Sequence, residues 1–278
     1  MKKRFPGILL VLLFIVAALV GSVIAVNAVP SEGGDTIPDS VELIITQGDT
    51  RTTITDLNKG DVFGDGSVKF RYDRNAQKGI LTLNGASIES ESDFPIDASG
   101  IDLLEIVLVG SNRIESPDTC VVANSLTFSG DGSIVINTKD PFGYTVDCCG
   151  GFTVSSGNVT VSGQKYGVCV DGPISVESGS LILKVADTNE GEAIVKGFDP
   201  PVIHIGDALA LFAGESPDGS DAVDTMTTDT DKILAAKYIR VRSAHAHCIC
   251  GGNTAVGDHT VHSDEAWIPW RSMDSLPD

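Results

Sequence analysis

The stretch Leu126-Thr-Phe128-Ser-Gly130-Asp-Gly-Ser-Ile134-Val-Ile136 sets a pattern that returns throughout residues 78–185. It reads as two short strands with alternating apolar residues, joined by a turn of small and polar residues. A two-stranded piece of this size cannot bury its apolar face alone, so we expect the copies to stack on one another. The other copies are Leu81-Thr-Leu83-Asn-Gly85-Ala-Ser-Ile88, Ile106-Val-Leu108-Val-Gly110, Phe152-Thr-Val154 with Val159-Thr-Val161, and Ile174-Ser-Val176 with Leu181-Ile-Leu183.

The spacing of the copies favours a solenoid. Apolar positions recur at roughly 20 to 26 residues, in the range of solenoid coils: Leu83, Leu108, Phe128, Val154 and Val176. A third apolar segment precedes each strand pair: Ile96 and Ala98, Cys120 and Val122, Val146 and Cys148, Val168 and Val170, and Ala193 and Val195. Three short strands per coil, without a helix-period segment between them, predict an all-β, right-handed parallel β-helix. The alternative is an antiparallel β-sandwich. The glycine that recurs after the first strand favours the solenoid.

The alternation of apolar residues also predicts a register. Phe128 is expected to point inward between Leu108 and Val154, and Thr127 to point outward. A register shifted by one residue would turn every one of these side chains to the opposite face.

The chain has six cysteines, and their pairing stays open. Cys120 and Cys148 fall on the inward phase, where small cysteines pack well. Cys149 and Cys169 lie on neighbouring coils on the other face. Six cysteines in an exported protein are compatible with disulfides, but packing of unpaired cysteines in the core is an equally open reading, and the spacing does not fix a connectivity.

The two ends of the chain differ from the repeat. Met1-Lys-Lys-Arg followed by the apolar run from Ile8 to Val26 predicts a signal peptide over residues 1–28, with cleavage after Ala25 or Ala28. An uncleaved membrane anchor is the alternative, and either reading places the rest of the chain in the secreted or cell-surface compartment. Residues 29–40 read as a linker and residues 41–242 as the β-helix with N-terminal capping strands. Residues 243–278 form a separate His/Cys/Trp-rich tail module, complete or truncated.

The charge balance limits the classes of partner. The formal net charge is −19, and removing Lys2, Lys3 and Arg4 with the signal makes it about −22. Polyanion binding needs Lys and Arg at the phosphates, so nucleic acid is excluded as a natural partner. The acidic surface favours solubility and cation binding.

The tail carries a candidate metal site. Two cysteines and two histidines supply four ligands of the kind that Zn²⁺ takes tetrahedrally: Cys248, Cys250, His259 and His262. His245 and His247 are alternates, and Trp267 and Trp270 are expected to pack over the ion. A crosslink through the cysteines and a linker without a site are the alternatives.

The sequence motifs that could indicate calcium binding or catalysis are less specific than the ligand cluster of the tail. Three Asp-Gly turns offer oxygens to Ca²⁺, although the same pair is common in ordinary turns: Asp65-Gly66, Asp131-Gly132 and Asp171-Gly172. Acidic candidates for a glycosidase or lyase are Asp102, Glu105, Asp147 and Asp171, with Arg113 as the one arginine in the coils. The sequence contains no nucleophile elbow and no His-Glu-x-x-His motif. We therefore expect a protein without catalytic activity.

With these motifs in view, the chain resembles the β-helical carbohydrate-binding surface proteins of clostridia and related Gram-positive gut bacteria. The resemblance covers roughly residues 78–212, in coils such as Leu81-Thr-Leu-Asn-Gly85-Ala-Ser-Ile88. It implies a pectate-lyase-like β-helix that binds polysaccharide, including acidic sugars, and holds calcium. The tail from His245 to Trp270 looks like a linker segment between β-helical modules of the same proteins.

The expected function is therefore an exported, non-catalytic surface protein that binds polysaccharide through a face of its β-helix. Tyr144 and Tyr166 are the main candidates for stacking on sugar rings. The alternatives are an adhesin or structural stalk, whose ligand is a protein or nothing, and a degenerate polysaccharide lyase. Release of unsaturated uronides would indicate the last.

Overall fold

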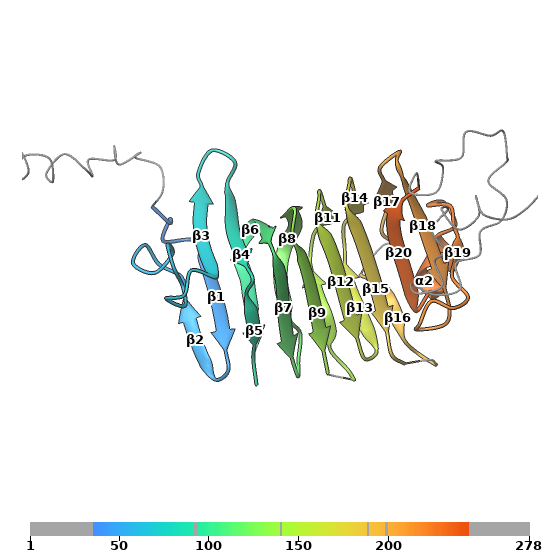
Figure 1. The fold of residues 1–278 in the computed structure, drawn as a ribbon, viewed down its shortest axis with the longest axis horizontal. Helices are drawn as coiled ribbons and strands as arrows, with labels where there is room; N and C mark the ends of the chain where they lie inside the picture. The colour runs from blue at the N-terminus through green and yellow to red at the C-terminus, as the bar shows by residue number, and fades with distance from the viewer. Residues whose placement is uncertain (1–35, 92–93, 140, 188, 198–199, 245–278) are drawn as a thin grey trace, which may run out of the picture. The chain divides into compact units, whose positions relative to one another are not determined.

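The computed structural model describes residues 36–91, 94–139, 141–187, 189–197 and 200–244. These residues form a parallel β-helix of about five turns, as the repeat predicts (Figure 1). The predicted signal peptide, most of the linker and nearly all of the tail module lie outside the described residues. Within the described ranges, no helix is long and apolar enough to cross a membrane.

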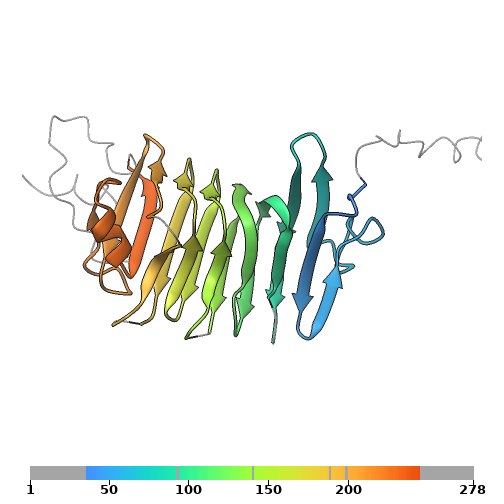
Figure 2. The ribbon, with the colours of Figure 1, turned by 180° about the vertical axis from the view of Figure 1, so that it is seen from behind.

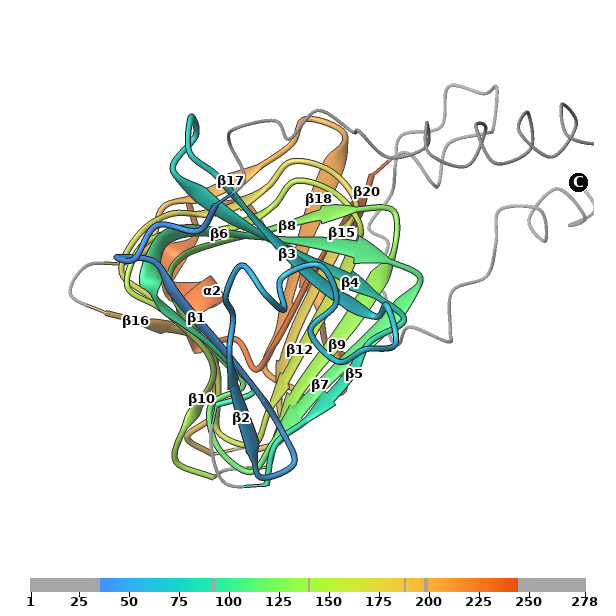
Figure 3. The ribbon, with the colours of Figure 1, turned by 90° about the vertical axis from the view of Figure 1, so that its left-hand side faces the viewer.

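Each coil contributes strands to three faces, which Figure 3 shows in a view along the solenoid. Face one contains the first parts of β6 (Ile96–Val109) and β8 (Val121–Gly130), then β10 (Tyr144–Cys148), β13 (Tyr166–Val170) and β16 (Glu192–Lys196). Face two contains β4 (Lys78–Asn84), the second parts of β6 and β8, then β11 (Phe152–Val154), β14 (Ile174–Val176) and β17 (Ile203–Ile205). Face three contains β5 (Ser87–Glu89), β7 (Ser111–Ser116), β9 (Ser133–Thr138), β12 (Asn158–Gly163) and β15 (Ser180–Val185).

Parallel pairing places equivalent side chains of successive coils above one another, so the core consists of apolar rows. Face one contributes Ile96, Val121, Val146, Val168 and Ile194. Face two contributes Ile106, Phe128, Val154, Val176 and Ile205. Face three contributes Ile88, Ile114, Ile136, Val161 and Leu183. All of these except Ile205 are buried. Removal of this apolar area from water is the main stabilising term of the fold.

The predicted phase of Phe128 is confirmed, but its neighbour is not the one expected. Phe128 is fully buried, and Val154 lies opposite it on the next coil. On the preceding coil its partner is Ile106, while Leu108 lies opposite Gly130. The expected alignment with Leu108 is wrong by two residues. Because Ile106 and Leu108 both point inward, the alternating pattern cannot distinguish the two registers.

In the third segment of the coil, two of the apolar residues that the pattern singles out do not point into the core. Val122 pairs with Asp147 on the outer surface, and Val121 and Ala123 take the inward positions. Likewise Ile194, not Val195, is aligned with the buried Val168. In both coils two consecutive residues are buried where the chain turns onto face one, so the alternation restarts there with a shifted phase.

A buried polar residue and a glycine hold the turns between faces two and three. Asn112 occupies an inward position; its Oδ1 accepts a hydrogen bond from the Ala86 N–H at 2.8 Å, and its Nδ2 donates to the carbonyl of Ser133 at 3.1 Å. These bonds satisfy a side-chain amide that would be costly to bury unpaired. Gly130 has a positive φ of 98°, and a Cβ there would meet the carbonyl of Leu108.

Both ends of the described solenoid are closed by elements that do not follow the coil pattern (Figures 1 and 2). At the N-terminal end, β1 (Glu42–Gln47) pairs antiparallel with β6 and with β2 (Thr50–Thr53), and β3 (Val68–Asp73) pairs antiparallel with β4. At the other end β20 (Tyr238–Ser243) pairs antiparallel with β15 and with β18 (Leu209–Gly214), which carries β19 (Val223–Asp224). Helix α2 (Thr230–Ala235) packs on β16. Such caps cover strand edges that would otherwise pair with other chains.

Candidate functional site

The predicted zinc ligands Cys248, Cys250, His259 and His262, and the alternates His245 and His247, lie outside the described residues. Zinc binding by the tail stays a prediction.

The Asp-Gly turns lie in three separate places. Asp65 belongs to the N-terminal cap, Asp131 to the turn between faces two and three, and Asp171 to the bend after β13. The Asp65 carboxylate accepts hydrogen bonds from the N–H and Oγ of Ser67, which lower its pKa. Asp171 lies against Gly197 of the next coil. Among the described residues, no group of three or more His, Cys, Asp or Glu side chains could hold a metal ion. Calcium at these turns also stays a prediction.

Of the four acidic candidates for catalysis, the structure brings two into proximity. Glu105 accepts hydrogen bonds from Lys78 Nζ at 2.5 Å and from Ser129 Oγ at 2.6 Å, so it is held in a local network on face two. Asp147 and Asp171 lie on adjacent coils near one another. Burial raises the pKa of Asp147, and the Asp171 carboxylate raises it further, while a hydrogen bond with Cys169 opposes the shift. Cys169 has a pKa raised to about 11, mainly by burial.

One edge of the solenoid is hollowed. The described parts of the turns that join face three to face one lie one above another at the bottom of Figure 3 and are here called the corner: residues 90–91, 94–95, 117–120, 139, 141–143, 164–165, 186–187 and 189–191. Backbone hydrogen bonds link the turns, such as Ser90 N–H to Glu115 O and Lys139 N–H to Ser116 O, both at 3.0 Å. The corner is therefore a regular stack rather than a set of independent loops.

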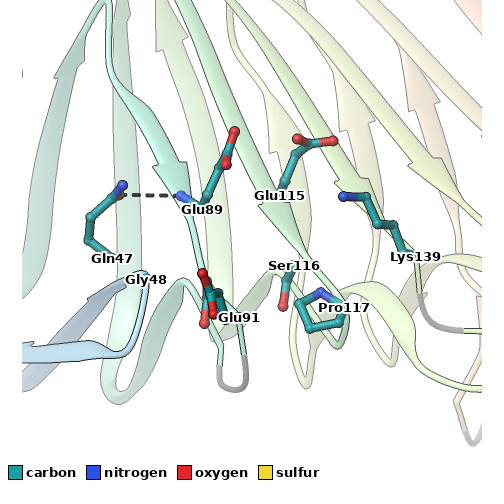
Figure 4. A pocket seen from close by; sticks show the side chains of 9 residues that line it. Gln47, Gly48, Glu89, Glu91, Glu115, Ser116, Pro117 and Lys139 are labelled. Atoms are coloured by element: carbon teal, nitrogen blue, oxygen red, sulfur yellow. Dashed lines mark hydrogen bonds between the residues drawn. The ribbon is translucent and has the colours of Figure 1, made fainter.

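The first hollow of the corner has a volume of about 520 Å³ (Figure 4). It is lined by Gln47, Gly48, Glu89, Ser90, Glu91, Glu115, Ser116, Pro117 and Lys139. Figure 4 shows Glu89, Glu115 and Lys139 on successive coils. Glu115 also accepts hydrogen bonds from Arg113 at 2.5 Å and from Asn137 Nδ2 at 3.1 Å, and these two contacts and the charge of Lys139 lower its pKa.

A pair of aromatic rings lies next to the corner, on the first residues of β10 and β13 on face one. Tyr144 and Tyr166 are aligned on adjacent coils, with ring centroids 5.5 Å apart. Lys165 Nζ lies 5.3 Å from the centroid of the Tyr166 ring and binds the Glu190 carboxylate at 2.6 Å. Gly163 permits the tight turn into β13, because a Cβ there would collide with the carbonyl of Tyr166. Both rings are only half-buried, so part of each is open to a ligand.

Two further features complete the corner. Phe142 precedes Tyr144 in the turn between β9 and β10, and 80% of its surface is exposed. A second hollow of about 220 Å³ is lined by Pro141, Gln164, Lys165, Ala186 and Asp187. The two hollows thus lie on the same edge of the solenoid. Phe142 and Tyr166 directly follow two residues of the second lining, Pro141 and Lys165, and the Tyr144 ring lies against that of Tyr166.

The sequence identified Tyr144 and Tyr166 but missed the rest of this arrangement. Phe142 lies outside the strand pattern, so the alternation of apolar residues does not identify it as a candidate. The glutamates at positions 89, 91 and 115 come together through coil stacking, and no local motif records that contact. Once the register is known, the sequence also shows an outward row with one residue per coil: Glu89, Glu115, Asn137, Ser162 and Lys184.

Comparisons with models of protein families, with curated proteins and with solved structures found no match to this chain.

Proposed function

We propose that this protein is an exported binding protein that holds a polysaccharide along the corner of its β-helix and does not cleave it. The observation that carries the proposal is that two hollows, the exposed Phe142 ring and two half-buried tyrosine rings lie along one edge of a rigid solenoid. Aromatic faces stack on apolar faces of sugar rings, and their polar tips can donate hydrogen bonds to hydroxyls. A repeating polymer can use several such contacts at once, which raises its avidity.

The composition of the corner supports a glycan rather than a protein as the ligand. Protein interfaces have an apolar centre that excludes water. Here the hollows are lined mostly by Glu, Gln, Ser and Lys, and Phe142 is the large exposed hydrophobic residue in the described turns of the corner. Polar hollows next to a few aromatic rings suit a ligand that is covered with hydroxyl groups.

The proposal is tested with the exported chain, residues 29–278, on a glycan array and by isothermal titration with the glycans that bind. Tyr144→Ala combined with Tyr166→Ala should weaken binding at least tenfold. The matched control is Thr127→Ala combined with Thr153→Ala, which removes two aligned outward side chains from face two and should leave the affinity unchanged. Circular dichroism checks that both variants are folded.

Two results would count against the proposal. The first is the absence of binding to any glycan, which would favour the stalk or adhesin alternative. The second is equal loss of affinity in both double variants, which would place the site away from the corner. Incubation of the bound polymer with the protein should release neither new reducing ends nor unsaturated uronides; release of either would show an enzyme.

A further inference from the structure

We propose that the glycan held at the corner is uncharged or carries amino groups, and that it lies parallel to the solenoid axis. This inference rests on the proposed function and adds to it the class and the direction of the ligand. It differs from the expectation of acidic sugars that follows from the resemblance to clostridial surface proteins.

The direction of the glycan chain follows from the positions of the two hollows and the aromatic rings along the solenoid. The first hollow is formed by the turns around Glu89 and Glu115, and the second by the turns around Lys165 and Asp187. Phe142 belongs to the turn beside the second hollow, and Tyr144 and Tyr166 are the first residues of the strands that follow the corner, β10 and β13. From the Glu89 turn to the Asp187 turn there are four steps between coils, and at about 4.8 Å per step they span about 19 Å. Only a chain that runs along the axis reaches both hollows and the rings.

The excess of negative charge lies at the first hollow. Three glutamates and one lysine line it, Arg113 is paired with Glu115, and Figure 4 shows Lys139 next to Glu115, so three carboxylates face two cations. At the second hollow the charges are close to balanced, because Glu190 binds Lys165, and Asp187 has Lys165 and Lys237 nearby. The rings and hollows make the site, and these carboxylates select among the ligands that could enter it.

A polyuronate would place a carboxylate on every sugar in front of these side chains. Two like charges a few ångströms apart repel each other strongly in a partly dry groove and less in free water. A neutral glycan meets no such repulsion. An amino sugar binds more tightly next to the carboxylates, because they attract its ammonium group, as do the faces of the tyrosine rings.

Pairs of polymers with the same sugar backbone and different charge test the class of ligand. One pair is methyl-esterified polygalacturonan and free polygalacturonate; the other is N-acetylated and N-deacetylated oligosaccharides of glucosamine. Binding of residues 29–278 is measured in chelator at low salt and again in about 1 M salt, where the Debye length is only about 3 Å. We expect at least one of these glycans to bind. Polygalacturonate should bind at least tenfold more weakly than its ester, and this difference in affinity should shrink in high salt.

The outcomes separate the two proposals. If polygalacturonate binds as tightly as its ester in chelator, the charge inference is wrong and the proposed function stands. If none of the four glycans binds and the array is also blank, the proposed function is overturned and the inference with it.

Variants identify the carboxylates responsible. Glu89→Gln combined with Glu91→Gln removes two charges from the first hollow and should reduce the discrimination between ester and acid. The control is Glu177→Gln combined with Glu215→Gln, which removes two exposed charges elsewhere and should leave the discrimination unchanged. An equal effect of the two double variants would mean that net charge, not the corner, selects the ligand.

Oligosaccharides of increasing length test the direction. The affinity should rise with length until the oligosaccharide covers the span of about 19 Å given by the coil spacing, and then level off. If the shortest oligomer that binds is as tight as the polymer, the ligand does not run along the axis.

Discussion

Replacing Phe128 with alanine tests whether the core is built as described. The side chain is fully buried between Ile106 and Val154, and its ring lies 5.7 Å from that of Phe152. Loss of a buried phenylalanine side chain costs about 3–5 kcal/mol. The aromatic contact adds about 0.5–1.5 kcal/mol, so we expect a loss near the upper end, about 4–5 kcal/mol.

The loss is measured by thermal and urea denaturation, followed by far-UV circular dichroism. For a domain of this size about 1 kcal/mol lowers Tm by about 2–4 °C, so Phe128→Ala should lower it by about 8–20 °C. Thr127→Ala, one residue away and pointing outward, should change stability by about 0.5 kcal/mol or less. A Phe128→Ala protein within about 1 kcal/mol of the wild type would refute the register on face two.

Other positions give independent predictions. Gly130→Ala should destabilise the protein by more than 1 kcal/mol, since its positive φ and the nearby Leu108 carbonyl both oppose a Cβ; denaturation measures it, and an unchanged midpoint would contradict the turn. Because the pKa of Asp147 is raised by folding, the stability it contributes is present below the unfolded pKa of about 3.9 and is lost as pH rises through the folded pKa. Asp147→Asn should therefore be more stable than the wild type at pH 7, and the gain should vanish near pH 3; equal stability at both pH values would refute it. Zinc added to the reduced protein should change the tryptophan fluorescence, and Cys250→Ser should abolish the change; an unaltered wild-type spectrum would favour a tail without a metal.

Much of the fold could be predicted because each strand of the β-helix has alternating apolar residues that are visible in a short stretch of sequence. Alternation fixes which side chains point inward within a strand, and this was right for Phe128 and for the buried Cys120 and Cys148. It does not fix which coil position lies above which. Moving from Leu108 to Ile106 keeps the same inward phase, so the correct pairing depends on how long each turn is, and that is set by the whole stack.

The alternation fails where the chain bends. Ahead of face one, Cys120 and Val121 are both buried, as are Ala193 and Ile194. A strand-period pattern cannot describe two consecutive inward side chains, so it does not show that Val122 and Val195 point outward. The same bends build the corner, which is why the sequence gives only a partial view of the candidate site.

The division between faces and corner also explains where a binding site can arise in such a molecule. On a face, each residue is held in register with its neighbours above and below, so a substitution of an inward residue changes its contacts with both neighbouring coils. The turns of the corner carry no such constraint on length: two residues, Gln164 and Lys165, join β12 to β13, whereas residues 186–191 join β15 to β16. Turns can therefore acquire an exposed ring such as Phe142 without disturbing the core, while the stacked strands beneath hold them at a fixed spacing. A ligand with a regular repeat is the kind that benefits from side chains presented at regular intervals on a rigid support.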